Sequence, residues 1–201
     1  VSPIEPVDLS SLIASTIDQV CDEYAMHYGK GYVVLWERMK TKLGPVVFAM
    51  IEHDQQEYAD QAMMAVDCEV GAEGAIPSEV PGGSSLLKIH GRVDRVDQQS
   101  EGSRIRIVDY KFSGGLTTRT DDPDLVNDAL QGRRLQPPLY SMMSSLSLGG
   151  HSGENSKEIL LPHRAIHSVE FRFIRPLNPE PLTFSSFPSS IWDTRTGDQL
   201  L

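Results

Sequence analysis

Two short segments, separated by a polar stretch, constrain the fold of this chain more than any other feature. The first is residues 91–97, with the sequence GRVDRVD, and the second is residues 107–111, with the sequence IVDYK. The stretch 97–103 between them is rich in turn-forming residues, so the two segments predict a β-hairpin. The midpoint between Asp94 and Asp109 falls between Glu101 and Gly102, inside that stretch, and residues equidistant from a hairpin turn face each other across the strands.

The predicted hairpin places two carboxylates and one ammonium group on a single face. Lys111 lies two positions after Asp109, and the alternation of side chains along a strand returns it to the same face. A register slip of one residue would send one carboxylate to the opposite face. The bland alternative is that the acids and the lysine form an ordinary solvated salt bridge, as we expect for Arg95 and Asp97 beside the turn.

Converging carboxylates suit a hard divalent cation. Magnesium uses one or two protein carboxylates and keeps several waters, and a cation relieves the repulsion between Asp94 and Asp109. Such an ion can generate hydroxide at neutral pH and stabilise charge on a phosphodiester. Lys111 would then position the attacking water or offset charge on the phosphate. The hairpin therefore predicts a phosphodiesterase site that uses Mg²⁺ or Mn²⁺.

Together with residues 136–140 (QPPLY), the two segments resemble the RecB/AddB-type branch of the PD-(D/E)XK nuclease superfamily. That branch has a G-x-x-D-R-x-D strand, a D-Y-K strand and a downstream Q-x-x-x-Y motif, which occur here in this order over residues 91–140. Weaker similarity extends back to a helical stretch near Trp36 and to Glu69. The resemblance implies an α/β fold with a restriction-endonuclease-like core, in which a central mixed β-sheet is flanked by helices.

The resemblance also assigns roles around the metal. Asp94, Asp109 and the backbone carbonyl of Tyr110 would be metal ligands, and Lys111 would be catalytic. Glu69, on the preceding candidate strand, would match the auxiliary acidic residue of the family, although nothing near it in sequence sets its strand register.

The Q-x-x-x-Y motif and one arginine complete the candidate site. Gln136 and Tyr140 would support the site by holding a phosphate or a neighbouring strand. The alternative for Tyr140 is a core aromatic at the start of a helix over residues 139–148, and Pro137 predicts that Gln136 precedes that helix. Arg92 would bind DNA, because it lies on the same face of the first hairpin strand as Asp94.

The chain departs from the family pattern in two places. An upstream histidine motif is expected, but the surroundings of His27 and His53 do not match it. We therefore expect either that the motif lies outside this chain, which begins Val-Ser-Pro and fits a fragment of a larger protein, or that this lineage works without it. After the D-Y-K lysine, Phe-Ser-Gly-Gly replaces the usual Thr-Gly, and its glycines still permit a sharp exit from the strand.

The composition limits which cofactors we expect the protein to bind and where in the cell we expect it to lie. Cys21 and Cys68 are the chain's two cysteines, too few for the four thiolates of an iron–sulfur cluster, and their spacing suits neither zinc nor a disulfide framework. No apolar run approaches the roughly 20 residues of a membrane span. No G-x-x-x-x-G-K-[ST] motif supplies an ATP site. We expect a cytoplasmic protein without a membrane association, and any helicase partner would lie on another segment or chain.

The net charge of −10 opposes strong binding to DNA phosphates. Lys88, His90 and Arg92 alternate on the face that holds Asp94, and further arginines lie nearby in the sequence. This local basic face suits a nuclease to which a partner delivers DNA. The alternative is that these residues are ordinary surface charges.

We expect a single domain over residues 1–201 with three parts. Its helical part (1–66) has a helix pattern over 9–39 that Gly29 and Gly31 interrupt, a break at Gly44–Pro45 and a helix over 46–66. Its catalytic core (67–148) has a strand over 67–76, a loop over 77–85, the hairpin, a loop over 113–123 and one or two helices over 124–148. Its last part has a loop over 149–156, a strand over 167–175 and a tail over 176–201.

The function that these features predict is a Mg²⁺-dependent DNA nuclease, a RecB-like exonuclease acting on DNA ends or single strands in recombination or repair. A second hypothesis is a catalytically inactive PD-(D/E)XK domain that binds DNA or acts as a scaffold in a helicase–nuclease complex. The missing histidine and the acidic charge favour it, whereas the intact acids and lysine oppose it. A weaker third hypothesis is a metal-dependent hydrolase with a substrate other than DNA.

Overall fold

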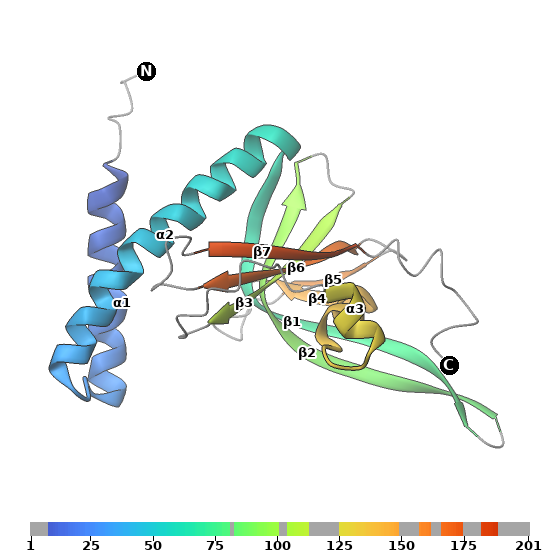
Figure 1. Cartoon of the computed structure of the whole chain (residues 1–201). Helices are drawn as coiled ribbons and strands as arrows, with labels where there is room; N and C mark the ends of the chain where they lie inside the picture. The colour runs from blue at the N-terminus through green and yellow to red at the C-terminus, as the bar shows by residue number, and fades with distance from the viewer. Residues whose placement is uncertain are drawn as a thin grey trace.

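A seven-stranded mixed sheet forms the centre of the molecule (Figure 1). The computed structural model describes residues 8–80, 83–100, 104–112, 125–148, 157–161, 166–174 and 182–188. The helices are α1 (Leu9–Tyr28), α2 (Val33–Gln61), α3 (Leu125–Leu130) and α4 (Gln136–Ser141). The strands are β1 (Met63–Val80), β2 (Gly83–Gln99), β3 (Ile105–Phe112), β4 (Met143–Leu148), β5 (Lys157–Leu160), β6 (Ile166–Ile174) and β7 (Leu182–Pro188).

The strand order is β5-β4-β1-β2-β3-β6-β7. β3 and β6 pair in parallel, and the other neighbours pair antiparallel. Helices lie on both sides of the sheet, so the prediction of a central mixed sheet flanked by helices is confirmed. None of the described helices is long and apolar enough to cross a membrane.

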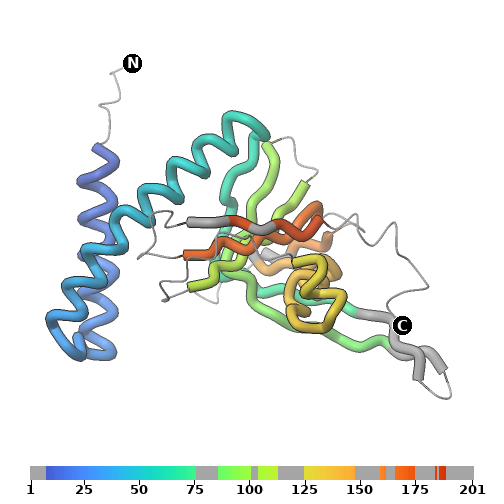
Figure 2. The backbone as a smooth tube through the Cα atoms, viewed as in Figure 1, coloured from blue at the N-terminus to red at the C-terminus, as the bar shows by residue number. Residues whose placement is uncertain are grey.

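The first two helices form a hairpin that extends from one side of the sheet (Figure 2). Asp8 caps α1, because its carboxylate accepts hydrogen bonds from the amides of Ser10 and Ser11. The helix ends at Tyr28, and the residue that caps it, Gly29, has a φ of 78° that a residue with a side chain rarely adopts. The predicted interruption at the two glycines is therefore confirmed.

Helix α2 runs through the pair Gly44–Pro45, so the break predicted there is wrong. Proline removes one helical hydrogen bond, but tertiary contacts offset this local cost. Val46 is buried, and Leu43 and Val47 line an apolar groove with α1. The helix ends at Gln61, earlier than predicted, because Ala62 adopts a left-handed conformation (φ 53°) and β1 begins at the next residue.

β1 and β2 form a longer hairpin than the sequence predicts. Their pairing continues to Val80 and Gly83, so most of the loop predicted over 77–85 is strand. An unbroken antiparallel ladder satisfies the backbone groups of this region without help from side chains. β4 pairs with β1 at Gly71–Gly74 alone, so the hairpin continues beyond its neighbour.

The last third of the chain contains more strand than predicted. Of the one or two helices predicted over 124–148, the structure has α3 and α4, but residues 143–148 form the strand β4, and β7 lies inside the predicted tail. The strand predicted over 167–175 is confirmed as β6. The predicted loops over 113–123 and 149–156, and the tail beyond residue 188, lie outside the described residues.

The two faces of the sheet are buried by different chemistry. On one side, α3 and α4 cover an apolar cluster from the strands, to which Leu125 and Tyr140 belong. Because side chains alternate along a strand, the opposite side carries the other set of residues. There α2 packs over charged side chains of β2, β3 and β6.

Candidate metal centre

The pairing of β2 with β3 has the register that the sequence predicts. The paired residues are Arg95 with Val108, Val96 with Ile107, Asp97 with Arg106, and Gln98 with Ile105. All four pairs share one midpoint with Asp94 and Asp109, which occupy the next positions along the two strands. β2 continues to Gln99, however, so Asp97 lies within a strand and not beside the turn.

Asp109 is a buried carboxylate whose charge is incompletely compensated. It is 4% exposed, and its Oδ1 lies 3.4 Å from the hydroxyl of Tyr140. Its Oδ2 forms an ion pair with Nζ of Lys111 at 2.5 Å but accepts no hydrogen bond from the described residues. Burial raises the pKa of Asp109, and the charge of Asp94 adds to this rise, while Lys111 and Tyr140 oppose it.

The backbone of β3 holds the second carboxylate. The N–H of Tyr110 donates a hydrogen bond to Oδ2 of Asp94 at 2.7 Å. This bond orients Asp94 toward Asp109, since Tyr110 is the next residue along β3. The carbonyl of Tyr110 as a metal ligand stays a prediction.

Lys111, Gln136 and Tyr140 form one hydrogen-bonded chain beside Asp109. Nζ of Lys111 donates to Oε1 of Gln136 (2.8 Å), and Nε2 of Gln136 donates to the hydroxyl of Tyr140 (3.3 Å). Burial, followed by the charges of Asp109 and Asp94, raises the pKa of Tyr140 to about 12. The hydroxyl therefore keeps its single proton, which it can donate either to Oδ1 of Asp109 or to the carbonyl of Arg92, each 3.4 Å away.

Helix α4 explains how the Q-x-x-x-Y residues meet. Gln136 is the first helical residue, so the prediction that it precedes a helix is wrong. Pro137 and Pro138 follow it without disruption because a first turn needs no intrahelical N–H donors. Four residues later, Tyr140 lies on the same face and, as one alternative predicted, it is also part of the apolar core.

Glu69 lies opposite Asp94 on β1 but contacts Arg92. The pairs Cys68 with Arg95 and Val70 with Val93 flank it and set that position. Its φ of 56° is left-handed, which is strained for glutamate. Oε2 of Glu69 lies 2.9 Å from Nε of Arg92, and both side chains are largely exposed. A role for Glu69 at the metal stays a prediction.

The basic face predicted on β2 is partly balanced by β1. Arg92 pairs with Glu69, and Nδ1 of His90 lies 3.3 Å from the carboxylate of Glu73. Strand pairing brings these acids opposite the basic residues, which the sequence of β2 alone does not reveal. The positive charge available to a phosphate is therefore smaller than the alternation of Lys88, His90 and Arg92 predicts.

A largely buried ionic cluster, which the sequence does not predict, lies on the opposite face of the sheet. We define it as three arginines and four carboxylates: Arg95, Arg106, Arg172, Asp54, Glu57, Asp97 and Glu170. Arg95 is 6% exposed and Asp97 is 0% exposed, so the prediction that they form a solvated pair is wrong. The reason is that α2 covers this face. An available signal was the placement of Arg106 and Arg172 within apolar strands, since charged residues are rarely buried unless paired.

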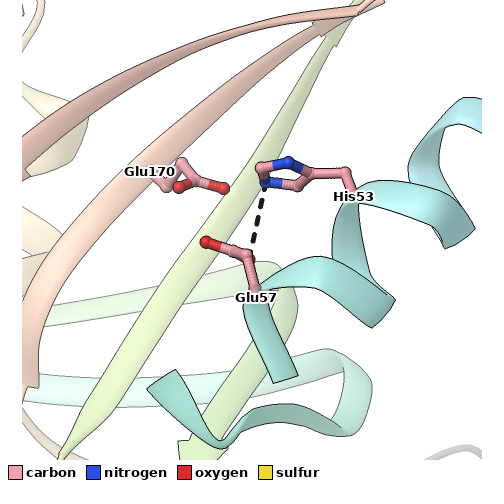
Figure 3. A group of neighbouring side chains, drawn as sticks. All are labelled: His53, Glu57 and Glu170. Carbon is pink, nitrogen blue, oxygen red and sulfur yellow. Dashed lines mark ion pairs between the residues drawn. The ribbon is translucent and has the colours of Figure 1, made fainter. Parts of the chain in front are cut away.

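His53, Glu57 and Glu170 also come together at the edge of this cluster (Figure 3). Their ligand atoms lie within 4.8 Å of one another, a spacing that a metal ion could bridge. Both carboxylates, however, are already paired with Arg106 and Arg172. Burial lowers the pKa of His53, whose ring stacks on Phe184. The arginines already neutralise these carboxylates, so Asp94 and Asp109 fit a cation better.

The family model of the PD-(D/E)XK nuclease superfamily matches residues 3–187, and the chain therefore belongs to that superfamily. Nuclease activity, which is the hydrolysis of phosphodiester bonds, is the activity this membership indicates, and divalent metals are typical of the superfamily. No curated protein is significantly similar to the chain. One solved structure, titled "Crystal structure of SSO0001", is 13% identical over 92% of this chain and 78% of that chain, with a TM-score of 0.31.

Proposed function

We propose that this chain is a Mg²⁺-dependent DNA nuclease of the RecB type. The observation that carries the proposal is the convergence of Asp94, Asp109 and Lys111 beside Gln136 and Tyr140. These residues come from β2, β3 and α4, and each belongs to one of the three motifs of the resemblance. Superfamily membership supports the nuclease activity, while the RecB type rests on the motifs.

The donor set fits a divalent cation. Asp94 and Asp109 supply two hard oxygen ligands, the number that magnesium commonly takes from a protein. Oδ2 of Asp109 is buried, and Lys111 offsets its charge only in part, so a cation bound there would further relieve the environment that raises the pKa of Asp109. When bound, Mg²⁺ or Mn²⁺ lowers the pKa of a coordinated water and stabilises charge on the phosphate.

The remaining residues of the site, Gln136, Lys111 and Tyr140, position charged groups around the candidate metal ligands. Gln136 accepts a hydrogen bond from the ammonium of Lys111, which lies 2.5 Å from Oδ2 of Asp109 and can also offset charge on a bound phosphate. The hydroxyl of Tyr140 lies 3.4 Å from Oδ1 of Asp109, where it can donate a hydrogen bond to the carboxylate. These contacts fix the site before substrate arrives, which reduces the entropy lost in reaching the reacting geometry.

We further propose that the protein acts on single-stranded DNA or DNA ends during recombination or repair, with a helicase as partner. This proposal rests on the RecB-type motifs. The charge of −10 and the pairs Glu69–Arg92 and Glu73–His90 support delivery of DNA by another protein. An acidic protein of this kind gains little affinity from phosphate contacts of its own.

The direct test is cleavage of end-labelled single-stranded and duplex DNA with Mg²⁺, Mn²⁺ or EDTA. We expect metal-dependent products from the wild type and none from Asp109→Ala. Lys111→Ala should lose at least about 100-fold in rate, as expected for a group that assists proton transfer or charge stabilisation. Asp60→Ala is the matched control, because Asp60 is an exposed carboxylate of α2 whose partner is Gln56. Undiminished cleavage by both site variants would refute the assigned site.

One observation favours the inactive scaffold as a second candidate. The ammonium of Lys111 lies 2.5 Å from Oδ2 of Asp109, where it neutralises the oxygen that a metal would use. A domain without a metal would be stabilised by this pair. Calorimetry with Mn²⁺ separates the candidates, since an absence of both binding and cleavage supports the scaffold.

A further inference from the structure

The side chains of Arg95 and Tyr110, which follow the candidate ligands Asp94 and Asp109 in sequence, lie on the opposite face of the hairpin of β2 and β3. Tyr110 lies between Asp109 and Lys111, and its N–H holds Asp94. Its side chain lies on the opposite side of the sheet, where the hydroxyl accepts a hydrogen bond from Nη1 of Arg95 at 3.3 Å. Arg95 is the residue next to Asp94. The contact between the side chains of Arg95 and Tyr110 therefore supports, from the opposite side of the sheet, the backbone that carries Asp94 and Asp109.

Arg95 is in turn fixed by a carboxylate of helix α2. Its Nη1 and Nη2 donate to the two oxygens of Asp54 at 2.6 and 3.0 Å, and its Nε donates to Asp97 at 2.5 Å. A bidentate pair of this kind restricts the guanidinium in both position and orientation. Arg95 therefore has little freedom to move independently of α2.

Asp54 also reaches across β3 to the strand on its other side. Its Oδ1 accepts a hydrogen bond from Nη1 of Arg172 at 2.6 Å, and Arg172 pairs with Tyr110 in the register of β3 and β6. One carboxylate thus connects β2 and β6, the two strands that flank β3. Through Arg95 and Arg172, Asp54 links β2 to β6 on the face of the sheet opposite the candidate metal centre.

The ion pairs of Asp54 with Arg95 and Arg172 stabilise this link between β2 and β6. Burial would raise the pKa of Asp54, but hydrogen bonds and charge from Arg95 and Arg172 outweigh burial and lower it. Removing one partner from a buried ionic group leaves the others uncompensated, which is costly. A change at Asp54 is therefore expected to shift Arg95 and Arg172.

We propose that Asp54 is a positioning residue that couples the docking of helix α2 to the affinity of the Asp94–Asp109 centre for its metal. The proposal rests on the proposed function, because it requires that centre to bind a divalent cation. The coupling is reciprocal, so metal binding strengthens the docking of α2 as much as docking strengthens metal binding. Asp54 itself contacts neither substrate nor metal.

The test measures Mn²⁺ binding by titration calorimetry with the full chain. Asp54→Asn should weaken Mn²⁺ binding by about 10- to 100-fold, the usual effect of losing a residue that orients a metal ligand. Tyr110→Phe removes only the hydroxyl that accepts from Arg95, and it should weaken binding toward the lower end of that range. Glu52→Gln is the matched control on the exposed side of α2, and it should bind as the wild type does.

Hydrogen exchange gives a second readout that does not depend on activity. Mn²⁺ should slow exchange in the second half of α2 in the wild type and in Glu52→Gln, but not in Asp109→Ala. Wild-type Mn²⁺ affinity in both Asp54→Asn and Tyr110→Phe would overturn the proposal, and Tyr110→Phe alone decides if Asp54→Asn does not fold. A wild type that binds no Mn²⁺ would instead refute the proposed metal-dependent function itself.

Discussion

The surroundings of Asp109 disfavour the ionised form of its carboxyl group. Burial and the neighbouring Asp94 raise its pKa, while Lys111 and Tyr140 compensate only in part. A carboxylate in such a place weakens the fold in the absence of a cation, which is a common compromise at functional sites. The residue is therefore a sensitive reporter of the site's electrostatics.

The first prediction at the residue scale concerns the pH dependence of stability. Because the pKa of Asp109 is higher in the folded than in the unfolded state, its ionisation destabilises the fold. The penalty is absent at pH values below the usual range of aspartate and grows until the pH exceeds the raised pKa. Asp109→Asn should therefore be more stable than the wild type at neutral pH in EDTA, and this gain should vanish on acidification. Urea unfolding across a pH series measures the difference, and a gain independent of pH would contradict the assignment.

The sequence predicts the positions of residues that depend on local structure, but not the burial of residues that depend on distant partners. The positions of Asp94, Asp109 and Lys111 follow from the middle of one turn and the alternation of strands, which are local properties. The burial of Arg95 and Asp97 depends on α2, whose Asp54 lies 41 positions before Arg95. No local pattern in the strand identifies such a partner.

At the scale of elements, β4 differs most from what the sequence predicts. The sequence predicts that Met143–Leu148 continues a helix, but the segment pairs with β1 and β5. Its position depends on Gly74, since a Cβ there would lie 2.7 Å from the carbonyl oxygen of Met142. A short segment without strong periodicity takes the structure that its neighbours allow, so propensity alone cannot decide it.

This close approach predicts a difference between two glycines of one strand. Gly74→Ala should destabilise the protein by about 1–3 kcal/mol, because the contacted atoms are backbone and cannot rotate away. Gly71→Ala is the control, since its Cβ would meet Ser147 at an ordinary 3.6 Å. Thermal unfolding of the two variants measures the effect, and equal stability would show that β4 does not approach β1 as described.

At the scale of the whole molecule, the two faces of the sheet are covered by chemically different sets of side chains. One side is an apolar cluster under α3 and α4, and the other is the ionic cluster under α2. The class of fold was predictable because the motifs identify the superfamily, and the mixed sheet is confirmed. The ionic interior was not predictable, because its members are spread over residues 54–172 and meet only in the assembled sheet.

Metal binding should stabilise the whole molecule. A ligand that binds only the folded state at 100 times its dissociation constant adds about 2.7 kcal/mol. For a protein of this size, that corresponds to a rise in melting temperature of roughly 5–10 °C. Mn²⁺ should produce this rise in the wild type and not in Asp109→Ala, as measured by scanning calorimetry. A similar rise in both proteins would mean that the ion binds elsewhere.

The parallel pairing of β3 with β6 has a consequence for synthesis of the protein. The hairpin of β2 and β3 is complete at Phe112, but Arg106 and Tyr110 find their partners on β6 only when residues 166–174 have been made. At about 5–20 residues per second, the hairpin leaves the ribosome several seconds before that strand. A nascent chain therefore carries the acids and the lysine without the support that aligns them, and the candidate metal centre is complete only after β6 has been made.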